Sequence, residues 1–314
     1  MTSAYDAVLL IAFGGPTSPD NIRPFLTRVT KGLSISPERL EEVAHHYAAV
    51  GGKSPLNEIT FRQARALEKL LNAGPTRLRV YVGMRNSSPF FTETLKQMAN
   101  GGVRNALGFI LSSHRTEASW ERYQKNIADA RAELGGKAPL LEYCDGWHGH
   151  RLFIQTWAEL IGAAYAKIDS GRRNSTPLIF TAHSLPSAMA ARSPYVDQLR
   201  SSAQAIADKL HRSHWRLAYQ SRSGNPEDSW LEPDIRDVLR KLAVEGCRDV
   251  VVAPIGFVCD HVEVLYDLDI EAKKIAGELQ MNLVRASCPN DDPMFIRMIA
   301  DVIAAKIDAG ENRG

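Results

Sequence analysis

The sequence has almost no net charge and no long apolar run. Its 38 Lys and Arg residues nearly balance its 36 Asp and Glu residues, for a formal charge of +2 over 314 residues. Domains dedicated to nucleic acid usually carry a basic excess, so we expect no nucleic-acid partner. No apolar run approaches the roughly 18 residues of a membrane-spanning helix, which excludes a transmembrane segment. Residues 1–6 contain no basic cluster and the apolar stretch 7–13 is too short for a signal peptide, so the sequence predicts a cytoplasmic protein.

The sequence also lacks paired cysteines and the common nucleotide-binding and hydrolase motifs. Because thiols in the cytosol usually stay reduced, we expect free cysteines and no metal site built from them alone. The glycine pairs at 14–15 and 51–52 are not part of a G-x-G-x-x-G motif, and neither a P-loop nor a G-x-S-x-G motif occurs. A dinucleotide site is therefore not supported. The four cysteines, none of them in a C-x-x-C arrangement, are Cys144, Cys247, Cys259 and Cys288.

Short apolar segments that suit β-strands alternate with longer segments in which apolar residues recur at helical spacing. This alternation predicts parallel sheets with helical crossovers, and the length predicts about two α/β lobes with about four strands each. The polar stretch Lys167–Thr176 indicates a boundary nearby, so we divide the chain into lobes 1–165 and 166–314. The expected strands are 7–13, 78–83, 106–111, 140–143, 178–182, 216–220, 249–254 and 281–285. The expected helices are 37–50, 60–71, 92–99, 120–134, 151–168, 195–211, 235–244 and 293–307.

Two groups of polar residues follow strand ends, where open parallel sheets bind ligands. His183 ends the strand 178–182, and a histidine at that edge can serve as a base or as a metal ligand. We also expect residues 264–271 to form a helix. Glu263, Asp267 and Glu271 are spaced i, i+4 and i+8, which on an α-helix places three carboxylates on one face. The alternatives are a structural histidine that bonds a loop and a solvated acidic face. If the two groups meet across a cleft, they suit Fe²⁺ binding or general acid–base chemistry.

Aromatic and basic residues near the N-terminus offer a further hypothesis. We expect most aromatic residues, among them Phe13, Phe25 and Tyr47, to lie in the core, although some could line a flat apolar pocket. Arg28 and Lys31 follow Phe25 on an expected helix and could reach the carboxylates of a ligand, unless they form a solvated basic face. The remaining histidine pairs lack a complete set of metal ligands, and we expect structural or surface roles for His45–His46, His148–His150 and His211–His214.

Several segments together resemble the ferrochelatases, which insert Fe²⁺ into a porphyrin. The most specific are FTAHSLP (180–186), YQSRSGNPEDSWLEPD (219–234) and VVVAPIGFVCDHVEVLYDLDIE (250–271), and LLIAFGGP (9–16) is similar as well. The resemblance spans nearly the whole chain. It implies two Rossmann-like lobes of the type II chelatase kind with a porphyrin cleft between them.

The resemblance also implies roles for single residues. It makes His183 the catalytic histidine of the A-H-S-L-P motif and Glu263 its acidic partner from the D-H-x-E-x-L-Y motif, both in contact with the metal. Asp267 and Glu271 match an acidic row that would serve as a metal route. For the porphyrin and its carboxylates, it implies contacts with Phe13, Thr30, Lys31, His46, Tyr47, Ser54 and Tyr123.

Within the family, the segments 28–55, 112–123 and 261–271 are more similar to the coproporphyrin branch. The resemblance therefore implies that Fe²⁺ and coproporphyrin III are converted to coproheme in heme biosynthesis. The alternatives are a protoporphyrin IX ferrochelatase that makes protoheme, a chelatase for a sirohydrochlorin-type ring, and a non-catalytic tetrapyrrole carrier. The branch further implies a monomer and a transient contact with a downstream coproheme decarboxylase.

Two departures from the family pattern bear on the metal chemistry. Some members carry an iron-ligating tyrosine where this chain has Phe13, and phenylalanine cannot ligate iron, although it can pack on the porphyrin face. Other members hold a 2Fe–2S cluster with cysteines near the position of Trp120 and in the C-terminal tail. Neither Trp120 nor the tail 308–314 offers a cysteine, so we expect no such cluster and no permanently bound cofactor.

Overall fold

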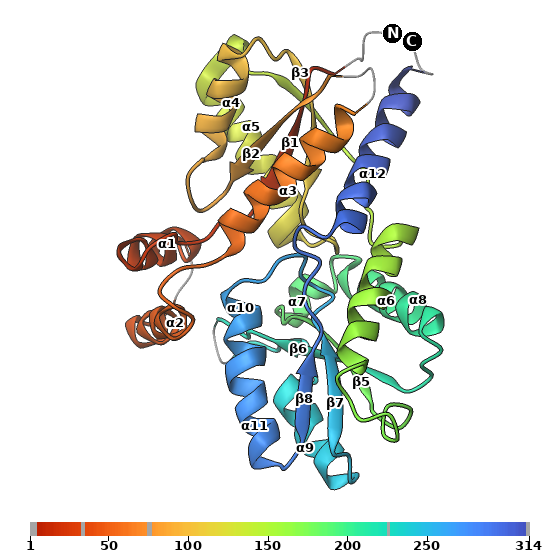
Figure 1. The fold of residues 1–314 in the computed structure, drawn as a ribbon. Coiled ribbons are helices and arrows are strands. Elements are labelled where there is room, and N and C mark those ends of the chain that lie inside the picture. The colour runs from red at the N-terminus through yellow and green to blue at the C-terminus, as the bar shows by residue number, and fades with distance from the viewer. Residues whose placement is uncertain (1–4, 33–34, 74–76, 225–226, 312–314) are drawn as a thin grey trace.

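The computed structural model describes residues 5–32, 35–73, 77–224 and 227–311, which form two α/β lobes (Figure 1). The N-terminal sheet has the strand order β2-β1-β3-β4 and the C-terminal sheet the equivalent order β6-β5-β7-β8. All neighbouring strands are parallel, so the prediction of two parallel four-stranded lobes is confirmed. The strands are β1 (Ala7–Ala12), β2 (Arg79–Met84), β3 (Asn105–Ile110), β4 (Leu140–Tyr143), β5 (Leu178–His183), β6 (Trp215–Gln220), β7 (Asp249–Ala253) and β8 (Asn282–Arg285).

Helices cover both faces of each sheet, as right-handed crossovers between parallel strands require. The described α-helices are α1 (Ile22–Val29), α2 (Pro37–Ala49), α3 (Leu56–Leu71), α4 (Phe91–Asn100), α5 (Arg122–Leu134), α6 (Arg151–Tyr165), α7 (Ser187–Ala190), α8 (Tyr195–Lys209), α9 (Ile235–Val244), α10 (Val262–Leu265), α11 (Lys273–Glu278) and α12 (Pro293–Glu311). Short 3-10 turns occur at Pro19–Asn21 and Gly135–Lys137, and π-helical segments at Glu117–Glu121 and Asp267–Ala272. None of the helices in these ranges has the length and apolar character needed to cross a membrane.

Strand β1 shows why the first sheet is buried on both faces. Its side chains alternate, so Leu9 and Ile11 join the cluster with α4 and α5, while Val8 and Leu10 join the cluster with α3 and α12. All six of its residues are buried. A strand of this kind appears in the sequence as a continuous apolar run, and this is the signal by which residues 7–13 were predicted as a strand.

Two helices connect the lobes. Helix α6 packs on α8, β7 and β8 of the second lobe, and α12 packs on α3 and β3 of the first lobe and on α6. One apolar core, with Leu67 and Phe109 in the first lobe and Phe180 and Val251 in the second, runs through the junction. The division into lobes 1–165 and 166–314 stays a prediction, because helices from each side of it pack across this junction.

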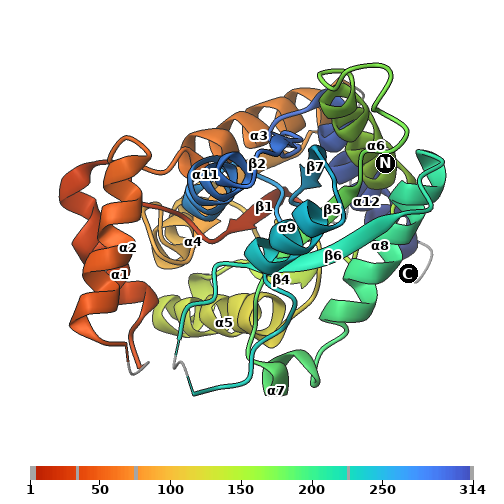
Figure 2. The ribbon, with the colours of Figure 1, turned by 90° about the horizontal axis from the view of Figure 1, so that it is seen from below.

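Helices α1 and α2 pack against each other and stand apart from the N-terminal sheet (Figures 1 and 2). Their apolar residues Phe25, Leu26 and Tyr47 form a small separate cluster that includes Val262 and Tyr266 of the second lobe. Ser36 caps α2, because its hydroxyl accepts a hydrogen bond from the backbone N–H of Arg39 at 3.2 Å, and Pro37 follows at the first helical position. The α1–α2 pair thus bridges the lobes at one side of the molecule.

Candidate active site

His183 and Glu263 meet although 80 residues separate them in the sequence. His183 is the last residue of β5, and Glu263 lies in the first turn of α10. His183 Nδ1 is 2.8 Å from Glu263 Oε2, and His261 Nε2 is 3.8 Å from the same oxygen. The side chains of His183 and Glu263 are 27% and 35% exposed. The pair is therefore tightly coupled and still open to a ligand.

Charge and burial shift the pKa values of His183 and Glu263 in opposite directions. Burial alone would lower the pKa of His183, but the Glu263 carboxylate outweighs it and raises that pKa above the usual histidine value. Burial would likewise raise the pKa of Glu263, but the charge of His183 and its hydrogen bond hold that pKa far below its usual range. Glu263 is thus ionised at neutral pH, and His183 is a stronger base than a free imidazole.

The backbone around the pair is fixed by contacts from three further elements. The Tyr195 hydroxyl of α8 donates to the His183 carbonyl at 3.0 Å, and Gln220 Nε2 at the end of β6 donates to the Glu263 carbonyl at 2.6 Å. Gly256, after β7, lies so close to β5 that a Cβ there would be 2.6 Å from the Ala182 Cβ. This close approach brings the segment that carries Glu263 against the end of β5.

The acidic row does not follow the regular helix that the sequence predicted. Residues 264–271 were expected as one α-helix, but α10 ends at Leu265 and the π-helical segment Asp267–Ala272 follows. The wider π turn changes the i, i+4 relation between the carboxylates, and such turns are common at functional sites. In the described part of the chain, no three His, Cys, Asp or Glu side chains form a group that could hold a metal ion. The three carboxylates act on one another electrostatically without forming one ligand set.

The Asp267 carboxylate is distinguished by its hydrogen bond to Ser221 and by its raised pKa. Its Oδ2 accepts a short hydrogen bond from the Ser221 hydroxyl, and Ser221 follows β6 with a left-handed backbone (φ 62°). Burial, helped by the charges of Glu263 and Glu271, raises the pKa of Asp267 to about 7. A non-glycine residue in the left-handed region stores backbone strain, which often marks a functional position.

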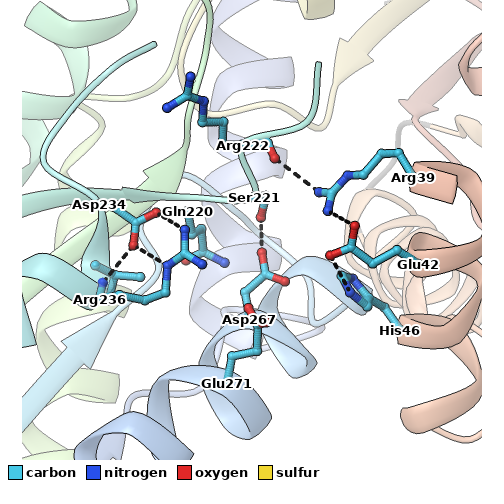
Figure 3. A pocket seen from close by; sticks show the side chains of 11 residues that line it. Arg39, Glu42, His46, Gln220, Ser221, Arg222, Asp234, Arg236, Asp267 and Glu271 are labelled. Atoms are coloured by element: carbon cyan, nitrogen blue, oxygen red, sulfur yellow. Dashed lines mark hydrogen bonds and ion pairs between the residues drawn. The ribbon is translucent and has the colours of Figure 1, made fainter. Parts of the chain in front are cut away.

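A cavity of about 100 Å³ lies where α2 of the first lobe meets the second lobe (Figure 3). Arg39 Nη2 closes one side by donating to the Arg222 carbonyl at 3.1 Å, and Arg39 also pairs with Glu42 at 2.7 Å. His46 stacks on Tyr266 with ring centroids 3.7 Å apart. The lining residues are Arg39, Glu42, His46, Gln220, Ser221, Arg222, Asp234, Ile235, Arg236, Asp267 and Glu271.

An aromatic row comes from the first lobe. The rings of Phe13 and Phe25 meet edge to face at 6.2 Å, and those of Phe25 and Tyr47 at 5.9 Å. Phe13 is 37% exposed, whereas Phe25 and Tyr47 are buried. Tyr47 packs in one cluster with Val262, the residue before Glu263. Burial raises the pKa of Tyr47, and the negative charge of Glu263 raises it further. Of these three rings, only Phe13 therefore offers an exposed apolar surface.

The other sequence-predicted porphyrin contacts lie in different surroundings. The Thr30 hydroxyl donates to the Leu26 carbonyl of its own helix, and Lys31 is exposed. Ser54 is buried against Gly15, and Tyr123 is buried edge to face with Phe91. The structure thus gathers His46, Tyr47, His183, Glu263, Asp267 and Glu271 around one region, but not Thr30, Lys31 and Tyr123.

Sequence reasoning did not single out Arg39, Gln220, Ser221 or Tyr266 as site residues, although all four border the site. Gln220 and Ser221 belong to the segment 219–234 on which the family resemblance partly rests, and they directly follow a strand. Their position at the end of β6 was the signal in the sequence that could have identified them as site residues. Arg39 and Tyr266 also lie in segments that carry the resemblance, 28–55 and 250–271. Neither follows a strand, and each reaches the site through a contact between the lobes.

The raised pKa of Asp267 leads to a prediction about stability. The folded-state pKa of about 7 lies above the usual aspartate value, so the carboxyl favours folding at low pH and this contribution is lost as pH rises through about 7. We therefore expect Asp267→Asn to raise the melting temperature more at about pH 8.5 than at about pH 5.5. Thermal unfolding of both chains in metal-free buffer measures this. An equal effect at both pH values would contradict it, and Asp237→Asn on the exposed face of α9 is the control.

Comparisons with known proteins give one consistent family. The family model described as "Ferrochelatase" matches residues 5–307. A coproporphyrin III ferrochelatase of Mycolicibacterium paratuberculosis is 44% identical over 302 residues, covering 95% of this chain and 87% of that protein. A ferrochelatase of Rhodopirellula baltica is 39% identical over 304 residues, covering 96% of this chain and 86% of that protein.

Solved structures support the fold independently. The chain is similar to SirB from Bacillus subtilis with Fe³⁺, with a TM-score of 0.61 and coverage of 98% of both chains. The sequence identity is only 8%, so this likeness concerns the fold alone. It confirms the predicted two-lobe chelatase architecture.

Proposed function

Because this chain belongs to the ferrochelatase family, we propose that it inserts Fe²⁺ into coproporphyrin III and forms coproheme in heme biosynthesis. The substrate assignment is supported by relatives named coproporphyrin III ferrochelatase, which are 39–44% identical over nearly the whole chain. The observation that carries the chemistry is the coupled His183–Glu263 pair, whose two side chains are both partly exposed.

Insertion of Fe²⁺ releases two pyrrole N–H protons. In this proposal His183 accepts one of them while the metal enters the ring, and the other passes to water. Its pKa is raised by Glu263, which makes the imidazole a better proton acceptor near neutral pH. Glu263 binds Nδ1, so Nε2 is the nitrogen that reaches the macrocycle or the iron. Glu263 also stabilises the imidazolium once the proton has arrived, because its own carboxylate stays ionised.

Asp267 and Glu271 supply the proposed route for iron. Both line the cavity beside Ser221, and oxygen donors of this kind suit a hard or borderline divalent cation. A carboxyl with a pKa of about 7 can exchange a proton for a metal ion without a large change in pH.

The porphyrin is proposed to lie against Phe13, with Tyr47 and His46 at its edge. Phe13 has no atom that can ligate iron, so its proposed contribution to this face of the macrocycle is packing. Thr30, Lys31, Ser54 and Tyr123 remain proposed contacts for the substrate carboxylates. Substrate-induced movement would be needed to bring the buried Tyr47, Ser54 and Tyr123 into contact.

The remaining assignments are proposals of the same kind. We propose a cytoplasmic monomer with no permanently bound cofactor and no 2Fe–2S cluster, which passes coproheme to a decarboxylase by transient contact. Cys144, Cys259 and Cys288 are buried and Cys247 is partly exposed. Burial raises the pKa of Cys259 to about 12, which disfavours the thiolate that a cluster needs. Iron and sulfide analysis of the purified protein tests this, and stoichiometric sulfide would contradict it.

An anaerobic assay with Fe²⁺ and either coproporphyrin III or protoporphyrin IX tests the proposed substrate. We expect absorbance to show rapid metallation of coproporphyrin and little metallation of protoporphyrin. Faster metallation of protoporphyrin would support the protoheme alternative. Tight binding of either porphyrin without metallation would instead support a tetrapyrrole carrier.

A further inference from the structure

Arg285, the last residue of β8, forms ion pairs with both ends of the segment 260–269, which contains Glu263 and Asp267 and is called the acidic segment below. The Arg285 side chain is only 12% exposed. Its Nε lies 3.0 Å from both carboxylate oxygens of Asp269, and its Nη2 is 2.7 Å from Oδ2. Its Nη1 donates to Asp260 Oδ1 at 3.0 Å. One guanidinium therefore binds two carboxylates at once.

These two aspartates bracket the residues proposed to handle iron. Asp260 precedes Glu263 by three positions, and Asp269 follows Asp267 by two positions inside the π-helical segment. Between them the backbone passes from the single α-helical turn of α10 into a π turn. This stretch therefore has few regular helical hydrogen bonds to hold its geometry. The ion pairs to Arg285 attach this stretch to the end of β8.

Asp260 and Asp269 each have a further polar partner besides Arg285. Asn290 Nδ2 donates to Asp260 Oδ2 at 2.7 Å, and the Asp260 backbone N–H donates to Asn290 Oδ1 at 2.8 Å. Lys273 Nζ lies 3.0 Å from Asp269. Burial would lower the pKa of Arg285, but Asp269 and Asp260 raise it above its usual value, so the cation persists.

We infer that Arg285 is a positioning residue for iron: through Asp260 and Asp269 it sets the spacing of the Glu263 and Asp267 carboxylates and thereby the affinity for Fe²⁺. This inference rests on the proposed function of that acidic segment. Arg285 acts on iron rather than on the porphyrin, because it pairs with Asp260 and Asp269, whereas the side chains proposed to hold the porphyrin come from the first lobe. The planar fork of arginine matches two carboxylates, and a lysine at this position cannot make the same set of bonds.

The test compares Arg285→Lys and Asp269→Asn with the wild-type chain. Partners of metal-binding side chains typically change metal affinity by 10- to 100-fold when replaced, so we expect Fe²⁺ affinity to fall about tenfold in each variant. Anaerobic calorimetry with Fe²⁺ alone measures this, and fluorescence quenching measures porphyrin affinity, which we expect to stay unchanged. Where turnover occurs, the KM for Fe²⁺ rises and the KM for porphyrin does not.

Arg216→Lys is the matched control. Arg216 lies on β6 of the same sheet and pairs with Glu245 at 2.5 Å, far along the chain from the acidic segment. We expect it to leave Fe²⁺ affinity unchanged. The double variant of Arg285→Lys with Asp269→Asn should bind Fe²⁺ no more weakly than the weaker single variant, because both changes break the same contact.

The inference is overturned if Arg285→Lys and Asp269→Asn lower the melting temperature but bind Fe²⁺ as the wild type does. It is also overturned if porphyrin affinity falls as much as Fe²⁺ affinity. Failure of the proposed function gives a different result, since the wild-type chain would then bind Fe²⁺ without metallating either porphyrin. The binding measurement with Fe²⁺ alone still decides the role of Arg285 in that case.

Discussion

Replacing His183 with alanine is expected to lower the rate of iron insertion by about two to four orders of magnitude, the usual contribution of a positioned acid or base. The alanine variant loses the imidazole at the end of β5, which contacts Glu263 through Nδ1. Pyrrole deprotonation would then depend on water. The initial rate of coproporphyrin metallation, followed by absorbance under anaerobic conditions, measures the loss.

A matched control separates this effect from damage to the fold. His45 is an exposed histidine on α2, and His45→Ala should metallate coproporphyrin at the wild-type rate. His183→Ala should remain folded, because the Tyr195 hydrogen bond is made to the His183 backbone carbonyl and survives the substitution. A folded His183→Ala protein with wild-type turnover would remove His183 from the mechanism.

Replacing Glu263 with glutamine is the second large prediction, and it has a pH signature. Neutral His183 is the form that accepts a proton, so activity of the wild-type chain falls as pH drops through the raised pKa of His183. In Glu263→Gln the carboxylate charge is gone and burial remains, which lowers the pKa of His183. We therefore expect the acid limb of the kcat/KM profile to move to lower pH.

The same variant should also be slower at its optimum. Glutamine cannot stabilise the imidazolium by charge, so we expect kcat to fall by about a hundredfold. The glutamine preserves shape, and the Gln220 bond goes to the backbone carbonyl of residue 263, so the local fold is retained. Glu245→Gln, remote from the site, should change neither quantity. An acid limb at the wild-type position in Glu263→Gln would contradict the proposed coupling.

Local patterns determined the fold class of this chain. The apolar runs of β1, β5 and β7 are buried on both faces, and strands of this kind can be recognised from single segments. Helical spacing identified most of the helices in the same way. The position of His183 at a strand end, together with its family resemblance, was also readable in the sequence, because ligands bind beyond such ends.

Tertiary structure decided how these parts meet. The sequence predicted a regular helix through Asp267, but this stretch contains a π turn, and Arg285 at the end of β8 binds it through Asp269. The contact between His183 and Glu263 spans 80 residues, and the close approach of Gly256, which follows β7, to Ala182 of β5 helps to bring them together. Residue spacing carries information about neighbours within an element, whereas the pKa of Asp267 and the bridging by α1 and α2 arise from contacts between elements. The sequence by itself therefore determined the fold class and the residues that we propose for the chemistry, and the tertiary structure decided the distances between them and the charges around them.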